Sequence, residues 1–433
     1  MKPPSILFIN RVYPPANGAT GQLLSDLASA LANRGHHVTV LTSGSVFSAP
    51  RSEVRDGVRV ERVTSAEFTR ASHWRRALSY LSLYPAFLLR ALRLPRTDVV
   101  VTLTDPPLLV VLGALLQALR GARHVHWAQD LYPELAEELA VLRRGGWLVR
   151  VLRFASTTAL RRANRIVAVG RCMKARLVAR GIAAECVAVI PNWGQEANAE
   201  SRTGLLAGTQ FRREHGLTDR FVIMYSGNLG LAHPFEAMLD AAGELQTSSP
   251  EALLLFVGDG PRLSWVKEHV LRRRLENVRF LPFQPREQLS ESLAAADIHL
   301  ASMLPELCGL VVPSKVCGIA AAGRPCVFLG PAESEAAHFL SHNDCGDVLS
   351  DAKGPCLAAC LQEWMADTTR LHAAGERAGA AAAAIDLDHA AAEFSNAIRR
   401  ACGLPEEASP NLGGLERTDL RLRPPASAPV LSP

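Results

Sequence analysis

The sequence predicts an α/β protein of two doubly wound domains that face each other across a cleft. Short, strongly apolar runs alternate with helical stretches, which is typical of parallel sheets covered by helices on both faces. This alternation occurs twice, on either side of a polar, glycine-containing segment at residues 191–219. The chain has 433 residues, enough for two or three domains of about 150 residues each. Such folds bind ligands beyond the carboxyl ends of their strands, so we expect the site in the cleft.

The first domain, predicted for residues 1–190, opens with a buried strand. Each apolar or β-branched run is followed by turn residues or by leucines at helical spacing. We predict strands at residues 6–10, 37–42, 98–103, 124–128 and 165–170, and helices at 21–33 and 108–119. Because strands and helices alternate, the sheet should be parallel.

The second domain, predicted for residues 220–384, follows the same rhythm after the linker at 191–219. We predict strands at residues 221–225, 252–257, 278–281, 298–301 and 326–329, and a helix through 234–245. A final helix at 385–403 is expected to pack back on the first domain. Residues 404–433 are rich in Pro, Ser and Gly and have few large apolar side chains, so we expect a disordered tail.

Hydropathy and cysteine usage indicate the compartment. The most apolar stretches, residues 77–89 and 108–119, are shorter than the ~20 residues of a membrane-spanning helix, and the N-terminus shows no signal-peptide pattern. The nine cysteines are odd in number and include no C-x-x-C pair, which favours a reducing compartment. We therefore expect a cytoplasmic protein.

Basic residues are concentrated in the first half of the chain. The net charge is only +5, but residues 141–180 contain eleven Lys or Arg and no Asp or Glu. This cluster is either a solvated basic face or a surface that attracts anionic lipid or a phosphorylated substrate. No nucleic-acid motif accompanies it, so nucleic acid is not an expected partner. Apolar side chains with flanking arginines predict a surface-lying amphipathic segment, formed by Trp74, Leu78, Leu81, Leu88 and Leu92.

Three glycine-containing loops follow predicted strands. Gly18 precedes the first helix, Gly227 and Asn228 follow the first strand of the second domain, and Gly258 and Gly260 follow the next strand. Unpaired N–H groups at a helix N-terminus bind anions, and small residues let a diphosphate approach the backbone. A plain strand-to-helix turn is the alternative for each loop. Neither the dinucleotide fingerprint nor the P-loop pattern is present, which argues against an NAD enzyme and a P-loop ATPase.

The most specific pattern lies at residues 305–325. Glu306 and Gly309 precede Pro313-Ser314-Lys315, where we expect a helix to start, and Ala-Ala-Gly-Arg-Pro ends that helix before a strand. The helix N-terminus and Lys315 can then face the same anion. Glu306 lies in a loop, where its carboxylate can accept hydrogen bonds from sugar or ribose hydroxyls.

In these motifs the chain resembles the GT-B glycosyltransferases of family 4, especially those of bacterial capsule and O-antigen synthesis. The matching stretches are Tyr13-Pro14-Pro15 and residues 98–107, 129–134, 190–192, 225–230, 256–260 and 306–325. The resemblance implies two Rossmann-like domains, with a nucleotide-sugar donor bound by the second and an acceptor bound by the first. It also implies transfer with retention of anomeric configuration, in surface polysaccharide biosynthesis, with no cofactor and no essential metal.

The resemblance further implies an acceptor and a location. The acceptor would be a saccharide or a sugar linked to polyprenyl diphosphate, which is held in the membrane. Because the first domain is basic, we expect the protein at the inner face of the cell membrane, in contact with the anionic lipid surface.

The chain departs from its relatives at the donor site. Many relatives carry two Glu residues eight apart before the A-x-G-x-P element. Glu306 can supply the first, but Gly318 stands at the place of the second. Relatives also place Arg and Lys after the glycine that opens the second domain, where this chain has Asn228 and His233. Lys315 is therefore the best remaining cation for the phosphates.

The remaining site candidates come from the same resemblance. Relatives often show a His at the end of the strand that here covers residues 124–128; this chain has His126 within it and Asp130 just beyond its end. The candidate catalytic residues are thus Asp130, His126 and Glu306. We favour Asp130, which lies where such folds bind ligands, whereas His126 can equally be packed inside. Glu335 is a weaker candidate for a donor contact.

Two other function classes stay open. A GT-B sugar-nucleotide epimerase or hydrolase shares the fold and the donor site but has no acceptor, so turnover of the donor alone would identify it. The absent second Glu makes a non-catalytic sugar-nucleotide-binding protein the other alternative. Saturable donor binding without turnover would favour that class.

Overall fold

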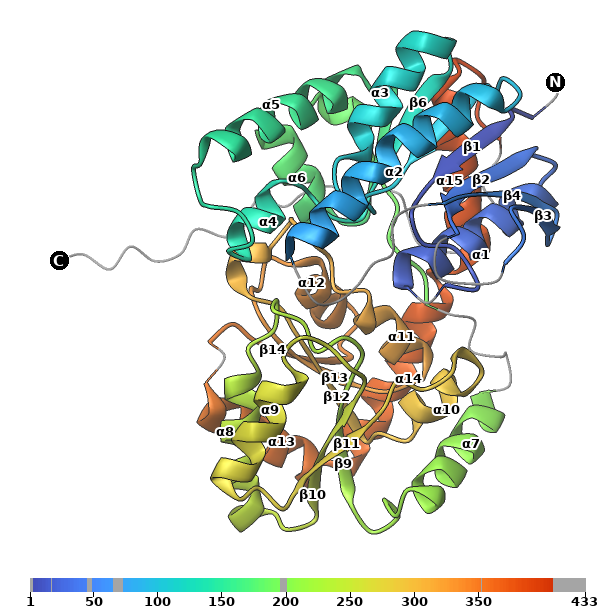
Figure 1. The fold of residues 1–433 in the computed structure, drawn as a ribbon. Helices are drawn as coiled ribbons and strands as arrows, with labels where there is room; N and C mark the ends of the chain where they lie inside the picture. The colour runs from blue at the N-terminus through green and yellow to red at the C-terminus, as the bar shows by residue number, and fades with distance from the viewer. Residues whose placement is uncertain are drawn as a thin grey trace, which may run out of the picture.

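Two sheets, each covered by helices on both faces, make up the computed structural model (Figure 1). The structure describes residues 3–16, 18–44, 49–64, 73–194, 201–351 and 353–407, without the side chains of residues 73–79, 201–207 and 286. The first sheet lies in the upper half of Figure 1 and the second in the lower half. The predicted α/β architecture of two doubly wound domains is confirmed.

An eight-stranded sheet forms the centre of the first domain. Its strands are β1 (Ile6–Ile9), β2 (Val38–Ser43), β3 (Ser52–Arg55), β4 (Val58–Val63), β5 (Val99–Thr102), β6 (Arg123–Ala128), β7 (Arg165–Ala168) and β8 (Val187–Val189). They lie in the order β3-β4-β2-β1-β5-β6-β7-β8, and only β3 and β4 pair antiparallel. β1 marks the switch point of the winding, since Ile6 pairs with Val38 on one side and with Val99 on the other.

The alternating side chains of β1 define the two faces of this sheet. The helices of the domain are α1 (Ala19–Asn33), α2 (His73–Arg93), α3 (Leu109–Arg120), α4 (Glu134–Glu138), α5 (Trp147–Arg162) and α6 (Arg171–Ala179), with a 3-10 turn at Ala184–Cys186. Ile6 and Phe8 pack in one core with α1, whereas Leu7 and Ile9 pack in another with α2 and α3. Successive residues of a strand point to opposite faces, so α1 lies on one side and α2 and α3 on the other.

The second domain repeats this winding around six parallel strands. They are β9 (Phe221–Ser226), β10 (Ala252–Val257), β11 (Val278–Leu281), β12 (Ile298–Ser302), β13 (Cys326–Leu329) and β14 (Gly346–Leu349), in the order β11-β10-β9-β12-β13-β14. The helices are α7 (Ser201–Glu214), α8 (Phe235–Ser248), α9 (Leu263–Arg273), α10 (Leu289–Ala294), α11 (Lys315–Ala321), α12 (Glu335–His342), α13 (Gly354–Ala366) and α14 (Thr368–Ala383), with 3-10 turns at Arg286–Gln288 and Pro305–Leu307. None of the helices described for this chain is both long and apolar enough to cross a bilayer.

The structure contains elements that the sequence patterns did not predict. β4 holds Glu61, whose buried carboxylate accepts hydrogen bonds from Arg59 (2.7 Å) and Arg90 (2.5 Å), so this strand is not a continuous apolar run. The segment predicted as a linker at 191–219 contains α7. The reason is that Phe211 and Leu217 are buried against the second sheet, in one cluster with its strand residues.

The chain returns to the first domain through α15 (Leu387–Ala401), which lies beside α1 and the first sheet (Figure 1). Phe394 is fully buried, and its ring centroid lies 6.1 Å from that of Phe8 and 5.2 Å from that of Trp127. The last element of the chain thus completes the core around the first strand.

Residues just beyond α15 are also held in place. The main chain of Glu407 donates to Asn396 Oδ1 (2.8 Å), and its carboxylate accepts from Arg399 (2.9 Å). Residues 404–407 therefore do not belong to a disordered tail, because side chains of α15 fix them. Residues 408–433 lie outside the described part of the chain.

We predict that Phe394→Ala destabilises the first domain by about 3–5 kcal/mol, since it leaves a cavity between Phe8 and Trp127. Phe154→Ala is the matched control, because Phe154 is 75% exposed. Urea unfolding followed by far-UV circular dichroism measures both. Equal midpoints for the two variants would show that α15 is not part of the core.

Candidate functional site

The segment between β12 and α11 joins the two domains. Asp130, two residues beyond β6, forms an antiparallel bridge with Val311. The N–H of Leu131 donates to the carbonyl of Leu310 (2.8 Å), and Arg176 Nε donates to the carbonyl of Cys308 (3.0 Å). Main-chain contacts from residues 308–311 thus bring the second domain against the ends of β6 and against α6.

Gly309 is required for this approach. Its φ of +75° lies in the left-handed region. A Cβ at this position would lie 2.6 Å from Arg176 Cγ and 2.7 Å from the carbonyl oxygen of Cys172. Any other residue would push the crossing segment away from α6. The structure therefore places Gly309, a predicted donor-site residue, in the contact between the domains.

Glu335 also lies at the domain contact. Its carboxylate accepts a hydrogen bond from the main-chain N–H of Arg171 (2.7 Å) and forms an ion pair with the Arg171 guanidinium (3.1 Å). Glu335 begins α12 and Arg171 begins α6, so one carboxylate lies at the positive N-terminal ends of two helices. Glu335, the weaker of the predicted candidates for a contact to the donor, is therefore bonded to the first domain.

The glycine loops of the second domain converge on Lys315. A Cβ at Gly227 (φ +119°) would lie 2.9 Å from Lys315 Cε. A Cβ at Gly258 would lie 2.1 Å from the carbonyl oxygen of Gly227, and one at Gly260 would lie 2.7 Å from Asn228 Oδ1. The loops after β9 and β10 therefore pack backbone on backbone, with Lys315 over the first of them. The structure brings together five of the predicted donor-site residues.

The ammonium group of Lys315 is held by an aromatic side chain. Nζ donates to the hydroxyl of Tyr225 (2.5 Å) and to the carbonyl of Asn228 (3.3 Å), and it lies 3.7 Å from the centroid of the Tyr225 ring. Burial lowers the pKa of Lys315 to about 7. No carboxylate is among its hydrogen-bond partners in the described residues. A bound anion would therefore stabilise the charged form of Lys315.

His233 lies beside Lys315 but is not positively charged near pH 7. Its Nδ1 bonds to the carbonyl oxygen of Ser302 (2.8 Å), and its ring centroid lies 5.6 Å from that of Tyr225. Burial, and then the charge of Lys315, lowers the pKa of His233 to about 3. His233 is therefore neutral near pH 7 and does not replace the second cation that relatives have.

The remaining predicted donor-site residues are spread around this group. Pro313 and Ser314 directly precede α11, which begins at Lys315 rather than at Pro313. Glu306 is exposed in the 3-10 turn, next to α4 of the first domain, and makes no hydrogen bond to Lys315 among the described residues. Gly18 belongs to the first domain, where it precedes α1 and a Cβ would lie 2.9 Å from Val12 Cγ1.

Two carboxylates of the first domain, Asp105 and Asp130, lie near each other beyond the ends of β5 and β6. Asp105 follows β5 and is held by two hydrogen bonds of 2.7 Å from the Arg11 guanidinium. Burial, and then the charge of Asp105, raises the pKa of Asp130 to about 7. We did not single out Asp105 or Arg11 from the sequence. The signal was present, since Asp105 follows its strand in the same way as Asp130 follows β6.

His126 is packed inside the first sheet. Its Nδ1 bonds to Thr102 Oγ1 (3.0 Å), which also bonds to His124 Nε2 (2.9 Å). Burial lowers the pKa of His126 to about 4, so the ring is neutral near pH 7. It can accept or donate one hydrogen bond there but cannot carry a charge.

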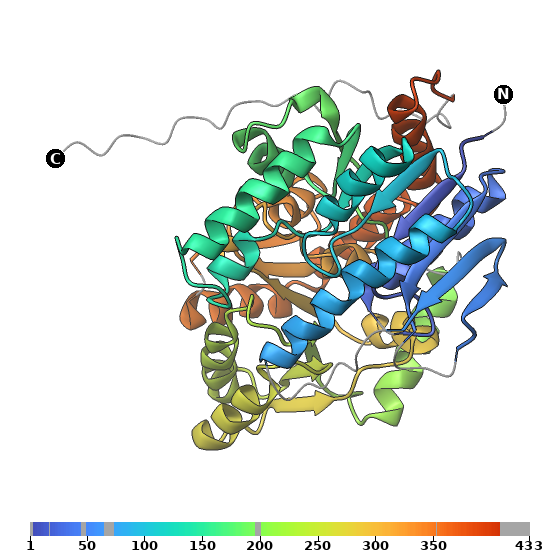
Figure 2. The same cartoon turned by 45° about the horizontal axis from the view of Figure 1, so that its top comes forward.

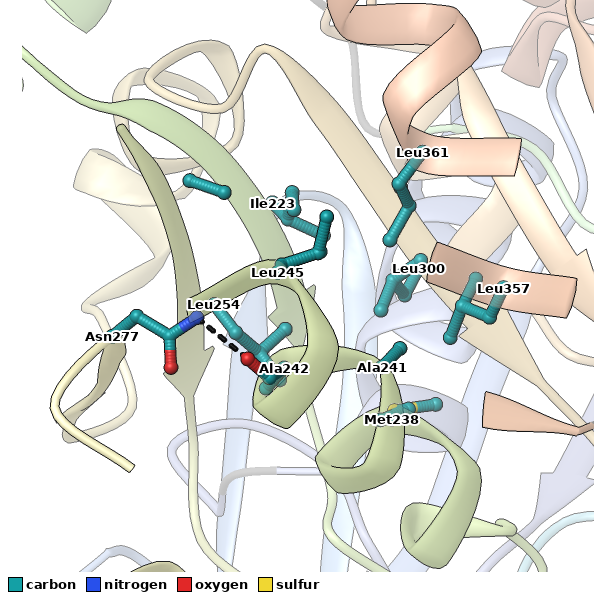
Figure 3. Close-up of a pocket in the computed structure, with 11 residues that line it drawn as sticks. Ile223, Met238, Ala241, Ala242, Leu245, Leu254, Asn277, Leu300, Leu357 and Leu361 are labelled. Carbon is teal, nitrogen blue, oxygen red and sulfur yellow. Dashed lines mark hydrogen bonds between the residues drawn. The ribbon is translucent and has the colours of Figure 1, made fainter. Parts of the chain in front are cut away.

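The described residues offer little for other kinds of site. No group of three or more His, Cys, Asp or Glu among them is arranged to hold a metal ion. An apolar cavity lies between the second sheet, α8 and α13 (Figure 3). Its one polar side chain, Asn277, donates to the carbonyl of Ala242 (2.8 Å), and none of its lining residues takes part in the domain contact. This cavity belongs to the core packing.

Comparison with known proteins gives matches in both halves. Residues 18–193 match the family described as glycosyl transferase 4-like domain, and residues 208–329 match glycosyl transferases group 1. WcaI of Escherichia coli strain K12, named a colanic acid biosynthesis glycosyl transferase, is 26% identical over 75% of this chain and 82% of its own length. Glycosyltransferase WbjE of Pseudomonas aeruginosa is 27% identical over 59% of this chain and 62% of its own.

Solved structures share the fold. HepE of Anabaena in complex with UDP-glucose has a TM-score of 0.69 and 19% identity, over 90% of this chain and 99% of that one. WaaG, a glycosyltransferase of lipopolysaccharide biosynthesis, has a TM-score of 0.63 and 20% identity, over 91% of this chain and 99% of its own. Both halves of this chain, and their arrangement, therefore have counterparts among glycosyltransferases.

We predict that Gly309→Ala separates the domains. The added Cβ meets Arg176 and Cys172, so small-angle X-ray scattering should show a larger radius of gyration, and the melting temperature should fall. Gly121→Ala is the control: its φ is +70° and a Cβ there has no neighbour within 4 Å. If both variants keep the wild-type radius of gyration, residues 308–311 do not hold the domains together.

Proposed function

We propose that this chain, which belongs to the family 4 glycosyltransferases of GT-B fold, moves a sugar from a nucleotide-sugar donor to a lipid-linked or saccharide acceptor. It is a glycosyltransferase of polysaccharide biosynthesis. The observation that carries the proposal is the meeting of two half-sites. The glycine loops with Lys315 lie on the second domain, Asp130 with Asp105 lies on the first, and residues 308–311 join them.

The loops after β9 and β10 suit a nucleoside diphosphate. Glycine at positions 227, 258 and 260 leaves the backbone without side chains where the loops converge. The N–H groups of these three glycines donate within the protein, so we propose that a diphosphate lies over the loops with Lys315 as its cation. The HepE structures hold UDP and UDP-glucose, which makes uridine nucleotides the first donors to test.

Charge is the second part of the donor proposal. When the glycosidic bond to the diphosphate breaks, negative charge grows on the leaving group. Lys315 would stabilise this charge, and losing one such contact typically costs roughly 3 kcal/mol. We propose that no metal ion is essential, because the ammonium group supplies the positive charge at this position.

Asp130 is proposed to act on the acceptor. A carboxyl group with a pKa near 7 is well matched to accept a proton from, or to orient, a sugar hydroxyl at neutral pH. We propose transfer with retention, by attack on the same face that the diphosphate leaves, with the donor phosphate assisting. The anomeric configuration of the product, read by NMR, tests this step; an inverted product would exclude it.

A polyprenyl-diphosphate-linked acceptor places the protein at the inner face of the cell membrane. Closure of the two domains over donor and acceptor would align the hydroxyl and exclude water. Thermal-shift screening of UDP-, GDP- and dTDP-sugars tests donor binding first, since a bound ligand raises the melting temperature by mass action. Transfer assays with the stabilising donor follow. Release of free sugar from the donor alone, with no transfer to any acceptor, would replace this function by hydrolysis.

We predict that donor affinity falls as the pH rises above about 7. Lys315 in the free protein has a pKa of about 7, and a bound diphosphate favours its charged form, so binding takes up a proton at higher pH. The dissociation constant of a nucleotide sugar should rise by up to about tenfold per pH unit, and calorimetry in two buffers should show proton uptake.

The Lys315 variants separate charge from structure. Lys315→Met should weaken donor binding by about a hundredfold below pH 7 and abolish the proton uptake. Lys353→Met is the control, because Lys353 is an exposed lysine of the same domain paired with Asp351. Proton uptake that persists in Lys315→Met would assign the titration to another group.

Asp130→Asn should lower the transfer rate by about 10² to 10⁴-fold while leaving donor affinity unchanged, because only the acceptor-side carboxylate is lost. Glu138→Gln is the control, since Glu138 is a carboxylate of the same domain that pairs with Arg144 at the surface. Steady-state kinetics and donor calorimetry measure both effects. Wild-type turnover in Asp130→Asn would remove this residue from the chemistry.

A further inference from the structure

Exposed apolar side chains gather on one part of the first domain. Sixteen large hydrophobic side chains are exposed in the described chain, and eleven of them lie on α2, α3, α5 or the turn before α5. These eleven are Leu81, Leu89, Leu92, Val111, Leu115, Leu119, Val141, Trp147, Leu148, Val151 and Phe154. Trp147 and Phe154 are the largest of them and are 76% and 75% exposed. Such a concentration is unusual for a surface that faces only water.

The exposed face of α3 consists of apolar residues alone. Val111, Leu115, Ala118 and Leu119 are its exposed residues, at the spacing of one helical stripe. A surface helix of a water-soluble domain normally carries charged or polar residues on that face. α3 therefore shows the solvent a face suited to an apolar environment.

The three helices form one continuous surface. α3 packs against α2 on one side and against α5 on the other, and Figures 1 and 2 show the three helices side by side. α2 and α3 share one cluster of buried side chains with the first sheet, and α5 packs against α3, so the three helices are neighbours on the surface of the first domain. We refer to this surface as the α2–α3–α5 face.

The exposed charged side chains on the helices of the α2–α3–α5 face are arginines, whereas two further arginines, Arg90 and Arg153, form ion pairs with glutamates of neighbouring elements. The three helices contain nine arginines and no Asp or Glu. Exposed arginines lie among or beside the apolar stripes of α2 and α5, namely Arg93, Arg143, Arg150 and Arg162. Apolar residues surrounded by cations, with no acidic residue, match the interface of an anionic bilayer.

We propose that the α2–α3–α5 face docks on an anionic lipid bilayer, with Trp147 and Phe154 inserted at the headgroup level. Aromatic side chains favour that level, and the arginines lie close to lipid phosphates when the apolar stripes are buried. The surface differs from the amphipathic segment predicted from the sequence. Leu81 and Leu92 belong to it, but Leu88 packs inward, and the side chains of Trp74 and Leu78 lie outside the description.

The docking face and the acceptor half-site are adjacent. α3 begins at Leu109, directly after the loop that carries Asp105, and the Tyr84 hydroxyl of α2 donates to the carbonyl of Pro107 in the same loop. Val111, in the first turn of α3, is thus the exposed residue of the face that follows Asp105 most closely in the chain. One consequence rests on the proposed function. A lipid-linked acceptor in the bilayer would reach Asp105 and Asp130 from this end of the face.

The test is co-sedimentation with vesicles of equimolar phosphatidylglycerol and phosphatidylcholine, compared with pure phosphatidylcholine. Wild-type protein should bind the anionic vesicles and dissociate at high salt. The double variant Trp147→Glu/Phe154→Glu should bind at least about tenfold more weakly, with an unchanged melting temperature because both side chains are exposed. Leu271→Glu/Phe283→Glu is the control: these side chains are 79% and 56% exposed on the second domain, and the variant should bind like wild type.

Several outcomes would overturn the docking face. These are equal vesicle binding by the double variant and wild type, no binding of wild type to anionic vesicles at low salt, or a wild-type dimer in light scattering that becomes a monomer in the double variant. The last result would assign the face to a second copy of the chain. Transfer to a water-soluble acceptor should be the same in wild type and the double variant. Vesicle binding with no transfer to any acceptor would instead contradict the proposed function alone.

Discussion

The main-chain contact between residues 308–311 and the end of β6 determines how the candidate residues of the two domains are placed relative to one another. It pairs Val311 with Asp130, and it exists only because Gly309 leaves room for the backbone of α6. The same segment leads directly into Lys315, so a residue that contacts the first domain is four positions from the cation of the second. The ion pair between Arg171 and Glu335 supports the contact from neighbouring helices. The segment that leads into Lys315 is therefore in direct contact with the residues that follow β6.

The two half-sites contain groups of opposite charge whose pKa values are shifted in opposite directions, and bound substrates would act on both groups. Burial lowers the pKa of Lys315 and raises that of Asp130, so both groups are near their point of ionisation at neutral pH in the free protein. A diphosphate would favour the charged lysine, and a hydroxyl donating to Asp130 would favour its carboxylate. Neither group is neutralised by a salt bridge among the described residues, whereas Asp105 and Glu335 are. Substrates would complete the charge balance.

Much of the fold follows from local sequence patterns, because buried parallel strands are continuous apolar runs that end in glycine or polar turns. The loops at Gly227 and Gly258 and the segment before Lys315 were located in the same way, and the structure brings them together, whereas their role as a donor site stays a prediction. β4 was not predicted because the buried, paired Glu61 interrupts its apolar run. α7 was not predicted because the composition of its segment is polar, although Phe211 is buried against the second sheet. The Arg171–Glu335 and Arg11–Asp105 pairs join residues far apart in the chain, and no local pattern reports such contacts. The exposed apolar stripe of α3 was not predicted, because the sequence of residues 108–119 indicates a helix but does not show which of its side chains face the solvent.

The central claim is that the glycine loops and Lys315 hold the diphosphate of a sugar nucleotide opposite Asp130. A crystal structure with the nucleotide sugar that stabilises the protein most would test it directly. We predict that phosphate oxygens lie within hydrogen-bond distance of Lys315 Nζ and of main-chain N–H groups in the Gly227 loop, with the sugar directed toward Asp130. A nucleotide bound elsewhere, or a diphosphate that contacts neither Lys315 nor this loop, would contradict the claim.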